Sequence, residues 1–107
     1  MDAKHRGARA ELIGAAWLLA RGYEVFRNVS DKGDVDLVGI KPNGDVELFD
    51  VKTGQVTKKG KGWLSWKMKA PSKWNIKYLV VDVSTKECKI FPIEEVPTDL
   101  PAPRPAV

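Results

Sequence analysis

The feature that most constrains the fold is an Asn-Gly pair between two segments of strand-forming residues. Residues 35–40 and 45–53 are rich in Val, Leu, Ile and Phe, and Asn43-Gly44 closes the short polar segment between them. An Asn-Gly pair favours the tight turns with positive φ that connect antiparallel strands. The two segments are therefore predicted to be antiparallel neighbours in one sheet.

The rest of the chain predicts further strands and helices around this hairpin. Residues 3–21 carry apolar side chains at helical spacing and are followed by Gly22, a residue that suits the end of a helix. The other expected elements are strands at 23–29, 76–83 and 87–93, a loop at 54–62 and a second helix within 62–75. The expected fold class is α/β, with a central mixed sheet of about five strands flanked by helices.

The chain is expected to form one domain with a short tail. Its 107 residues suffice for one hydrophobic core and not for two. Residues 97–107 hold four of the seven prolines, which favours an extended segment outside the core. The predicted organisation is a single domain at 1–96 and a Pro-rich tail at 97–107.

Composition argues against a membrane protein and against a structural zinc protein. The longest apolar run, residues 12–20, is about half the length of a membrane span, and Gly14 interrupts it. One cysteine, Cys88, and one histidine, His5, provide neither an internal disulfide nor a zinc ligand cluster. A cytoplasmic protein without a membrane span is expected, in the cytoplasm of the host cell if a phage encodes it.

Positive charge is concentrated in one segment. Residues 53–81 contain seven lysines and no Asp or Glu, so this segment carries +7, the whole chain +4 and the remainder −3. Such a segment suits contact with the phosphate backbone of DNA, and the alternative is an ordinary solvated lysine loop. Trp63, Trp66 and Trp74 interleave with the later lysines, a pattern compatible with stacking on unpaired bases. The lysines expected to contact DNA are Lys58, Lys59, Lys61, Lys67 and Lys69.

Asp50 and Lys52 form a candidate catalytic pair. Residues two apart in a strand project to the same face, so these side chains follow Val46 and Leu48 on one apolar face. An acid and a lysine on such a face are costly to bury without mutual pairing or a metal. A surface ion pair is the alternative interpretation of a D-x-K triplet taken alone.

A second carboxylate is expected beside this pair. The hairpin places Asp36 next to Asp50, and an oxygen-rich site without Cys or His suits Mg²⁺ or Mn²⁺. Such a metal would polarise a phosphoryl oxygen and lower the pKa of a bound water. Lys52 would hold or help to deprotonate the attacking water and would screen developing negative charge.

The residues around these acids resemble the core motif of the PD-(D/E)XK nucleases. GDVDLV, a hairpin and DVKTG follow one another, and 14 residues separate Asp36 from Asp50. Val35 stands at the motif's nominal proline, and Asp50 stands where many relatives have Glu. In addition, RGARAELIGAAWLLARGYEVFRNVS is similar to the first helix and strand of archaeal-type Holliday-junction resolvases. The resemblance runs from Arg6 to about Pro92.

This resemblance implies a restriction-endonuclease-like core and a magnesium-dependent endonuclease acting on DNA. It adds a helix glutamate to the site, so the expected catalytic residues are Glu11, Asp36, Asp50 and Lys52. The expected metal ligands are Glu11, Asp36, Asp50 and Val51. Arg6, Arg27 and Ser30 are expected to approach DNA. Gln55 is a candidate contact to a phosphate or base, with a plain polar loop residue as the alternative, just as Glu11 could be a solvated helix carboxylate.

Several substrates and one other class of function stay open. A junction resolvase active in DNA recombination, a homing or restriction-like enzyme and a nicking endonuclease of a phage or mobile element would share this core. A DNA-binding module that has lost cleavage is a further alternative, although the presence of all four catalytic residues argues against it. Because one active site cuts one strand, a homodimer is expected for symmetric cutting of two strands.

Overall fold

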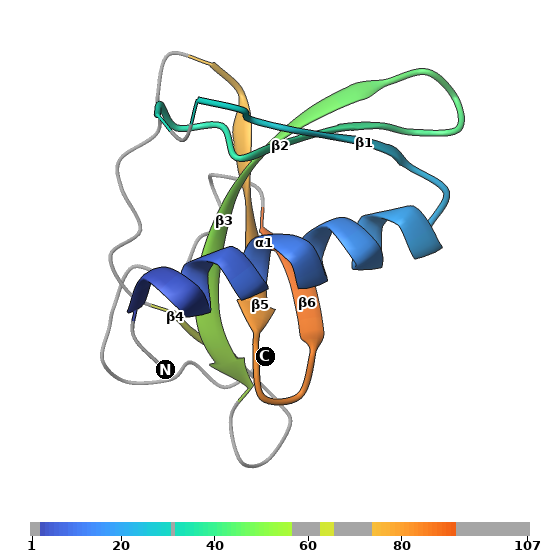
Figure 1. Ribbon diagram of the computed structural model, residues 1–107. Coiled ribbons are helices and arrows are strands. Elements are labelled where there is room, and N and C mark those ends of the chain that lie inside the picture. The colour runs from blue at the N-terminus through green and yellow to red at the C-terminus, as the bar shows by residue number, and fades with distance from the viewer. Residues whose placement is uncertain (1–2, 31, 57–62, 66–73, 92–107) are drawn as a thin grey trace.

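The computed structural model describes residues 3–30, 32–56, 63–65 and 74–91. Its elements are α1 (Ala3–Ala20), β1 (Glu24–Arg27), β2 (Leu37–Ile40), β3 (Val46–Val56), β4 (Trp63–Ser65), β5 (Ile76–Asp82) and β6 (Glu87–Phe91) (Figure 1). Five strands lie in the order β1-β2-β3-β5-β6, and β4 pairs with the end of β3. The β3 and β5 strands are parallel and the other pairs antiparallel, so the expected mixed α/β sheet is confirmed.

The hairpin predicted from the Asn-Gly pair connects β2 and β3. Ile40 pairs with Val46, and the Gly44 amide donates to the Lys41 carbonyl at 2.8 Å. Gly44 has a φ of 92°, a left-handed conformation that glycine adopts without the steric penalty of a Cβ. This turn fixes the register in which Asp36, one residue before β2, comes beside β3.

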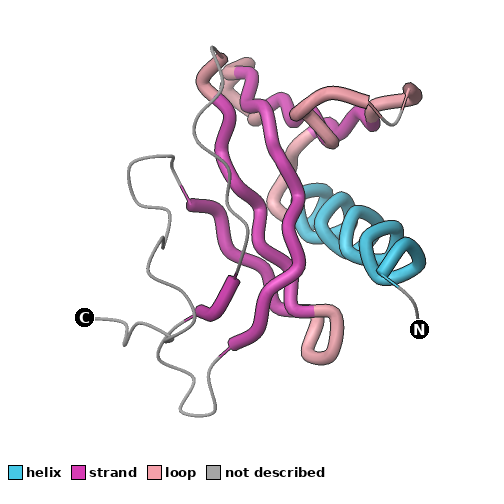
Figure 2. Tube along the Cα trace, turned by 90° about the vertical axis from the view of Figure 1, so that its left-hand side faces the viewer, coloured by secondary structure: helices cyan, strands magenta, loops and turns pink. Residues whose placement is uncertain are grey.

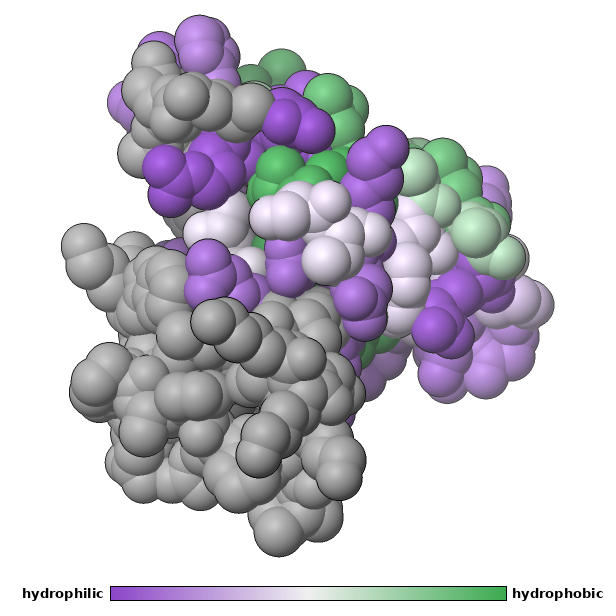
Figure 3. All heavy atoms as spheres, turned by 90° about the horizontal axis from the view of Figure 1, so that it is seen from below, coloured by the Kyte–Doolittle hydropathy of each residue, from purple (hydrophilic) through white to green (hydrophobic). Residues whose placement is uncertain are grey.

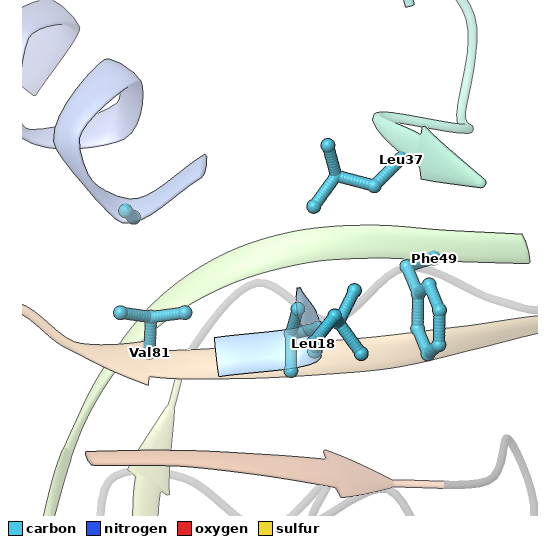
Figure 4. Close-up of a cluster of buried hydrophobic side chains, with 6 residues drawn as sticks. Leu18, Leu37, Phe49 and Val81 are labelled. Carbon is cyan, nitrogen blue, oxygen red and sulfur yellow. The ribbon is translucent and has the colours of Figure 1, made fainter. Parts of the chain in front are cut away.

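α1 covers one face of the sheet (Figure 2). It supplies two of the six residues of the central buried cluster. The Gly14 position lies so close to β5 that an added Cβ would come within 2.8 Å of the Leu79 side chain, which explains why a glycine stands there. Across the described part of the chain, no helix is long and apolar enough to cross a membrane. The central buried cluster consists of Ala10, Leu18, Leu37, Phe49, Leu79 and Val81, with Leu18 set among the strand side chains (Figure 4).

A polar network on the face covered by α1 joins β3, β5 and the residue before β1 near the hairpin end of the sheet. The Tyr23 hydroxyl donates to Glu47 Oε1 at 2.6 Å, and Lys77 forms an ion pair with the other oxygen of the same carboxylate. Because Glu47 has partners on both sides, its half-buried charge is compensated. The network therefore holds the start of β5 and the residue before β1 against β3.

Two expected elements are corrected by the fold. Residues 54–56 were assigned to a loop, but they extend β3 and pair with β4. Residues 63–65 lie in the segment 62–75, within which a second helix is expected, but they form β4 because their backbone groups pair with Gly54, Gln55 and Val56. The rest of that expected loop and helix, together with the tail at 97–107, lies outside the described residues.

Candidate active site

Asp36 lies where the ladder between β2 and β3 ends. Its amide donates to the Phe49 carbonyl at 2.8 Å, and its carbonyl accepts from the Asn28 amide at 3.0 Å. Its Oδ2 oxygen accepts a hydrogen bond from the Val51 amide at 2.7 Å. The side chain thus replaces the backbone acceptor that a longer β2 would offer to β3. The carboxyl group is held beside the peptide that joins Asp50 to Val51.

Asp50 and Lys52 project together from β3, as the alternation of strand side chains predicts. Asp50 is 7% exposed, and its Oδ1 oxygen lies 3.4 Å from the Lys52 Nζ. This is the face of the sheet opposite α1, because Phe49 packs in the cluster that includes the α1 residues and its neighbours in the strand point the other way. The pair lies beside Tyr78 and Val80 in register, and both of these residues are buried.

The two aspartates influence each other's protonation. Burial raises the pKa of Asp36 to about 6, and the neighbouring Asp50 charge raises it as well, while the bond from Val51 acts in the opposite direction. Burial also raises the pKa of Asp50, and Lys52 lowers it. A hydrogen bond between the two carboxyls favours the protonated form of Asp36 and the ionised form of Asp50. Below its pKa, Asp36 therefore carries the proton that the two groups share.

The donor set suits a hard divalent cation in its chemistry. Two adjacent carboxyls that resist being ionised together gain from a cation, since its charge takes the place of the shared proton. Their oxygens are the ligand type that Mg²⁺ prefers. Within residues 3–30, 32–56, 63–65 and 74–91, however, no three Asp, Glu, His or Cys side chains gather into a possible metal-binding group. The side-chain donors brought together are Asp36 and Asp50, with the Val51 peptide bonded to the first of them.

Glu11 lies on α1 and contacts Arg27 at the end of β1. The Arg27 Nε donates to the Glu11 Oε1 at 3.2 Å. The structure does not gather Glu11 with Asp36 and Asp50 into a group of three carboxylates among the described residues. Its pairing links the helix to the residue that precedes Asn28. The metal role of Glu11 and the DNA role of Arg27 stay predictions.

Asn28 shapes the loop before Asp36, although it is not among the site residues predicted from the sequence. Its Nδ2 donates to the carbonyls of Lys32 and Val35, both at 2.8 Å. Its Oδ1 accepts from the amide and the hydroxyl of Ser30, also at 2.8 Å. Asn28 therefore ties both ends of this loop together, in the manner of an Asx turn. Ser30 lies exposed in the loop, and its expected DNA contact stays a prediction.

Two of the expected DNA contacts lie together on another part of the surface. Arg6 and Gln55 both line a cleft of about 470 Å³ between α1, the end of β3 and the turn from β5 to β6. The sequence separates these two residues widely, and the packing of α1 on the sheet brings them together. The five lysines expected to contact DNA, Lys58, Lys59, Lys61, Lys67 and Lys69, lie outside the described residues.

Comparison with known proteins gives a similarity of fold. No protein-family model and no curated protein sequence matches this chain. Among solved structures, the chain is similar to the bacterial homing endonuclease I-Ssp6803I, with a TM-score of 0.67 and 17% sequence identity. The match covers 87% of this chain and 67% of that chain. At this identity the likeness shows a shared fold, and the fold of this chain is therefore one that an endonuclease also has.

Proposed function

We propose that this protein is a metal-dependent endodeoxyribonuclease of the PD-(D/E)XK kind, which hydrolyses phosphodiester bonds in DNA. The observation that carries this proposal is the buried Asp50 beside the half-buried Asp36, with the Lys52 ammonium 3.4 Å from the Asp50 carboxyl. Removing two acids and a cation from water, even in part, is costly for stability, so a site of this kind is better explained by chemistry than by packing. The fold shared with a homing endonuclease supports DNA as the substrate.

The three side chains have distinct tasks in this proposal. Mg²⁺ or Mn²⁺ bound by Asp36 and Asp50 would supply Lewis-acid activation of a phosphoryl oxygen and of water. Asp36 is preoriented for binding by the Val51 amide, which fixes its Oδ2 oxygen. Lys52 donates hydrogen bonds to the attacking water and balances the negative charge that develops on the phosphate. Its contact with Asp50 holds the ammonium at the site before DNA arrives.

The proposed substrate rests on two observations, a resemblance in sequence and a similarity of fold. The sequence resemblance to archaeal-type resolvases supports a four-way junction, and the shared fold supports linear duplex of the kind that a homing or restriction-like enzyme cuts. Both substrates require two strands to be cut, and one chain carries one such site. We therefore propose a homodimer, which light scattering at micromolar concentration tests with and without a four-way junction. A monomer in both conditions contradicts the resolvase assignment and leaves the chemistry in place.

A panel of labelled DNA tests the proposed activity. Linear duplex, single strand, flap and four-way junction are incubated with the protein in Mg²⁺ and, separately, in EDTA. We expect Mg²⁺-dependent cleavage of at least one duplex-containing substrate. Asp45→Asn serves as the control, because Asp45 is an exposed acid in the hairpin turn and its loss leaves the site unchanged.

Two outcomes of this panel contradict the proposal in different ways. Binding of DNA without cleavage of any substrate in Mg²⁺ or Mn²⁺ indicates a DNA-binding module on the same fold. Calorimetry that detects no binding of either metal then supports the module. Cleavage at the same rate in EDTA contradicts metal dependence.

A further inference from the structure

A second surface of the protein carries the chemistry of an anion-binding site. The cleft of about 470 Å³ lies at the end of the sheet where β3 and β5 finish and where the first half of α1 passes. None of the three proposed catalytic side chains lines it. Figure 3 shows the molecule from below, and the described part of this face carries hydrophilic side chains with apolar and intermediate ones between them.

Cations from two separate elements line the cleft. Arg6 and Arg9 come from α1, where residues three apart lie on the same side of a helix, and Lys86 comes from the turn between β5 and β6. Gln55 and Ser84 add an amide and a hydroxyl that donate hydrogen bonds. Guanidinium groups match the geometry of phosphate oxygens, so the lining suits a phosphate group.

One oxygen of the carboxylate in the lining is directed to the turn. Asp82 Oδ1 accepts hydrogen bonds from the amides of Ser84 and Thr85, at 3.0 and 3.3 Å. These two bonds partly compensate its negative charge and shape the turn that presents Ser84 and Lys86. Three cations against one carboxylate leave the cleft with an excess of positive charge.

The backbone at Lys86 gives a further reason to assign it a task. Lys86 has a φ of 65°, and within the described residues it is the one residue other than glycine with positive φ. A lysine has to pay a steric penalty in this conformation, which glycine avoids. The turn would therefore form more readily with glycine. The presence of lysine indicates that its side chain has a role at this position.

We propose that this cleft binds a backbone phosphate of the DNA, away from the phosphodiester bond that is cut. The inference rests on the proposed nuclease function and adds a contact for the same substrate. Along β3, Gln55 lies roughly 16 Å from Asp50, which is the length of several steps of a DNA strand. Side chains alternate along β3, so the cleft and Asp50 lie on opposite faces of the strand. A DNA molecule that contacts both the cleft and Asp50 must therefore pass around the end of the sheet.

The test measures DNA affinity of the full chain at a series of salt concentrations, in EDTA so that no cleavage occurs. Fluorescence anisotropy with a labelled duplex gives the dissociation constant and its dependence on salt. Arg9→Gln and Lys86→Gly each remove one positive charge from the cleft. Arg21→Gln removes the same charge about 18 Å away along the helix and is the matched control.

We expect each cleft variant to weaken binding several-fold and to lower the slope of log affinity against log salt by about 0.9, the value for one lost phosphate contact. The Arg21→Gln variant keeps the slope of the wild type. Lys86→Gly also keeps or raises the thermal unfolding midpoint, because it relieves the left-handed backbone. If Lys86→Gly loses affinity for DNA while its stability is undiminished, the loss is an effect on binding and not on folding.

The outcomes that overturn the inference differ from those that overturn the proposed function. If the wild type cleaves DNA in Mg²⁺ and both cleft variants keep its affinity and slope, the cleft is not a phosphate site and the nuclease stands. If Arg21→Gln reduces the slope as much as they do, the effect is one of net charge and the site is rejected. If the wild type neither binds nor cuts DNA, both proposals fail.

Discussion

The Oδ2 oxygen of Asp36 accepts a hydrogen bond from the backbone amide of Val51 at 2.7 Å. This contact joins the residue that precedes β2 to the peptide that follows Asp50, across the point where the two strands stop pairing. A site residue is thereby positioned by the sheet itself, and sites on such rigid elements are held more accurately than sites on loops. Protonation of Asp36 therefore affects the site, and it can be followed through the pH dependence of stability.

The first prediction concerns the pH dependence of stability. The folded-state pKa of Asp36 is raised from 3.8 to about 6, mainly by burial, so folding favours the protonated carboxyl. The stability that the protonated Asp36 carboxyl contributes is fully present below pH 3.8 and is lost as the pH rises through 6. Without metal, the thermal unfolding midpoint of the wild type should therefore fall relative to that of Asp36→Asn between about pH 4 and pH 6. Equal pH profiles of the two proteins contradict this assignment.

Addition of Mg²⁺ should reverse this trend. A cation binds the ionised carboxyls, so it should raise the unfolding midpoint of the wild type more at pH 7 than at pH 5. Asp36→Asn lacks one ligand and should gain little at either pH. Scanning calorimetry with Mg²⁺ and with EDTA checks this. An equal rise of the unfolding midpoint in both proteins would show that Mg²⁺ binds at a site that does not include Asp36.

The role of Lys52 is tested by Lys52→Met. Turnover should fall by about 100-fold or more, because the ammonium acts on charge that develops in the transition state. Metal binding should stay measurable by calorimetry. Since Lys52 lowers the pKa of Asp50, the pH at which the residual rate rises should move upward. Lys41→Met, in the hairpin turn, is the control, and normal turnover of Lys52→Met assigns the task to another residue.

Asn28 is predicted to position Asp36 without touching the substrate. Asn28→Ala removes the bonds to Lys32, Val35 and Ser30, so the loop before Asp36 loses its fixed shape. We expect metal affinity to fall by about 10-fold to 100-fold, as for other groups that orient a ligand. Asn28→Asp keeps the acceptor for Ser30 and should recover part of the affinity. A variant with lower stability but unchanged metal affinity limits Asn28 to a structural role.

The packing of α1 is tested by two neighbouring leucines. Leu18 is 0% exposed and Leu19 is 59% exposed. Leu18→Ala should lower the free energy of unfolding by about 2–5 kcal/mol, the range for a buried leucine. Leu19→Ala should change it by less than about 0.5 kcal/mol, since little buried surface is lost. Urea denaturation of both variants measures the difference, and similar losses contradict the orientation of the helix.

The sequence was informative wherever the physical rule is local. The turn at Asn43-Gly44 and the shared face of Asp50 and Lys52 follow from a dihedral preference and from the alternation of strand side chains. The helix from Ala3 to Ala20 is predicted by apolar residues at helical spacing, but Leu12 and Leu19 are exposed, so that spacing does not identify its buried face. Each of these depends on residues that are close along the chain.

Features that depend on distant contacts could not be predicted in the same way. β4 forms because Trp63–Ser65 meet the end of β3, while the local composition favoured a loop and a helix. The face of Asp50 depends on where α1 packs, and the alternation alone does not choose between the two faces. The cleft between Arg9 and Lys86 arises from the fold of the whole chain. The Asn28 side chain was detectable only as a residue that favours turns.

The most direct test of the central claim compares the wild type with Asp36→Asn and Asp50→Asn on one labelled DNA that the wild type cuts. Asparagine keeps the size of the side chain and removes the charge that a cation needs. In Mg²⁺, single-turnover cleavage by either variant should fall by more than about 100-fold, while its affinity for the DNA persists or increases because repulsion from the phosphates is lower. Asp45→Asn should cleave at the rate of the wild type. Undiminished cleavage by Asp36→Asn or Asp50→Asn contradicts a metal site formed by these two residues.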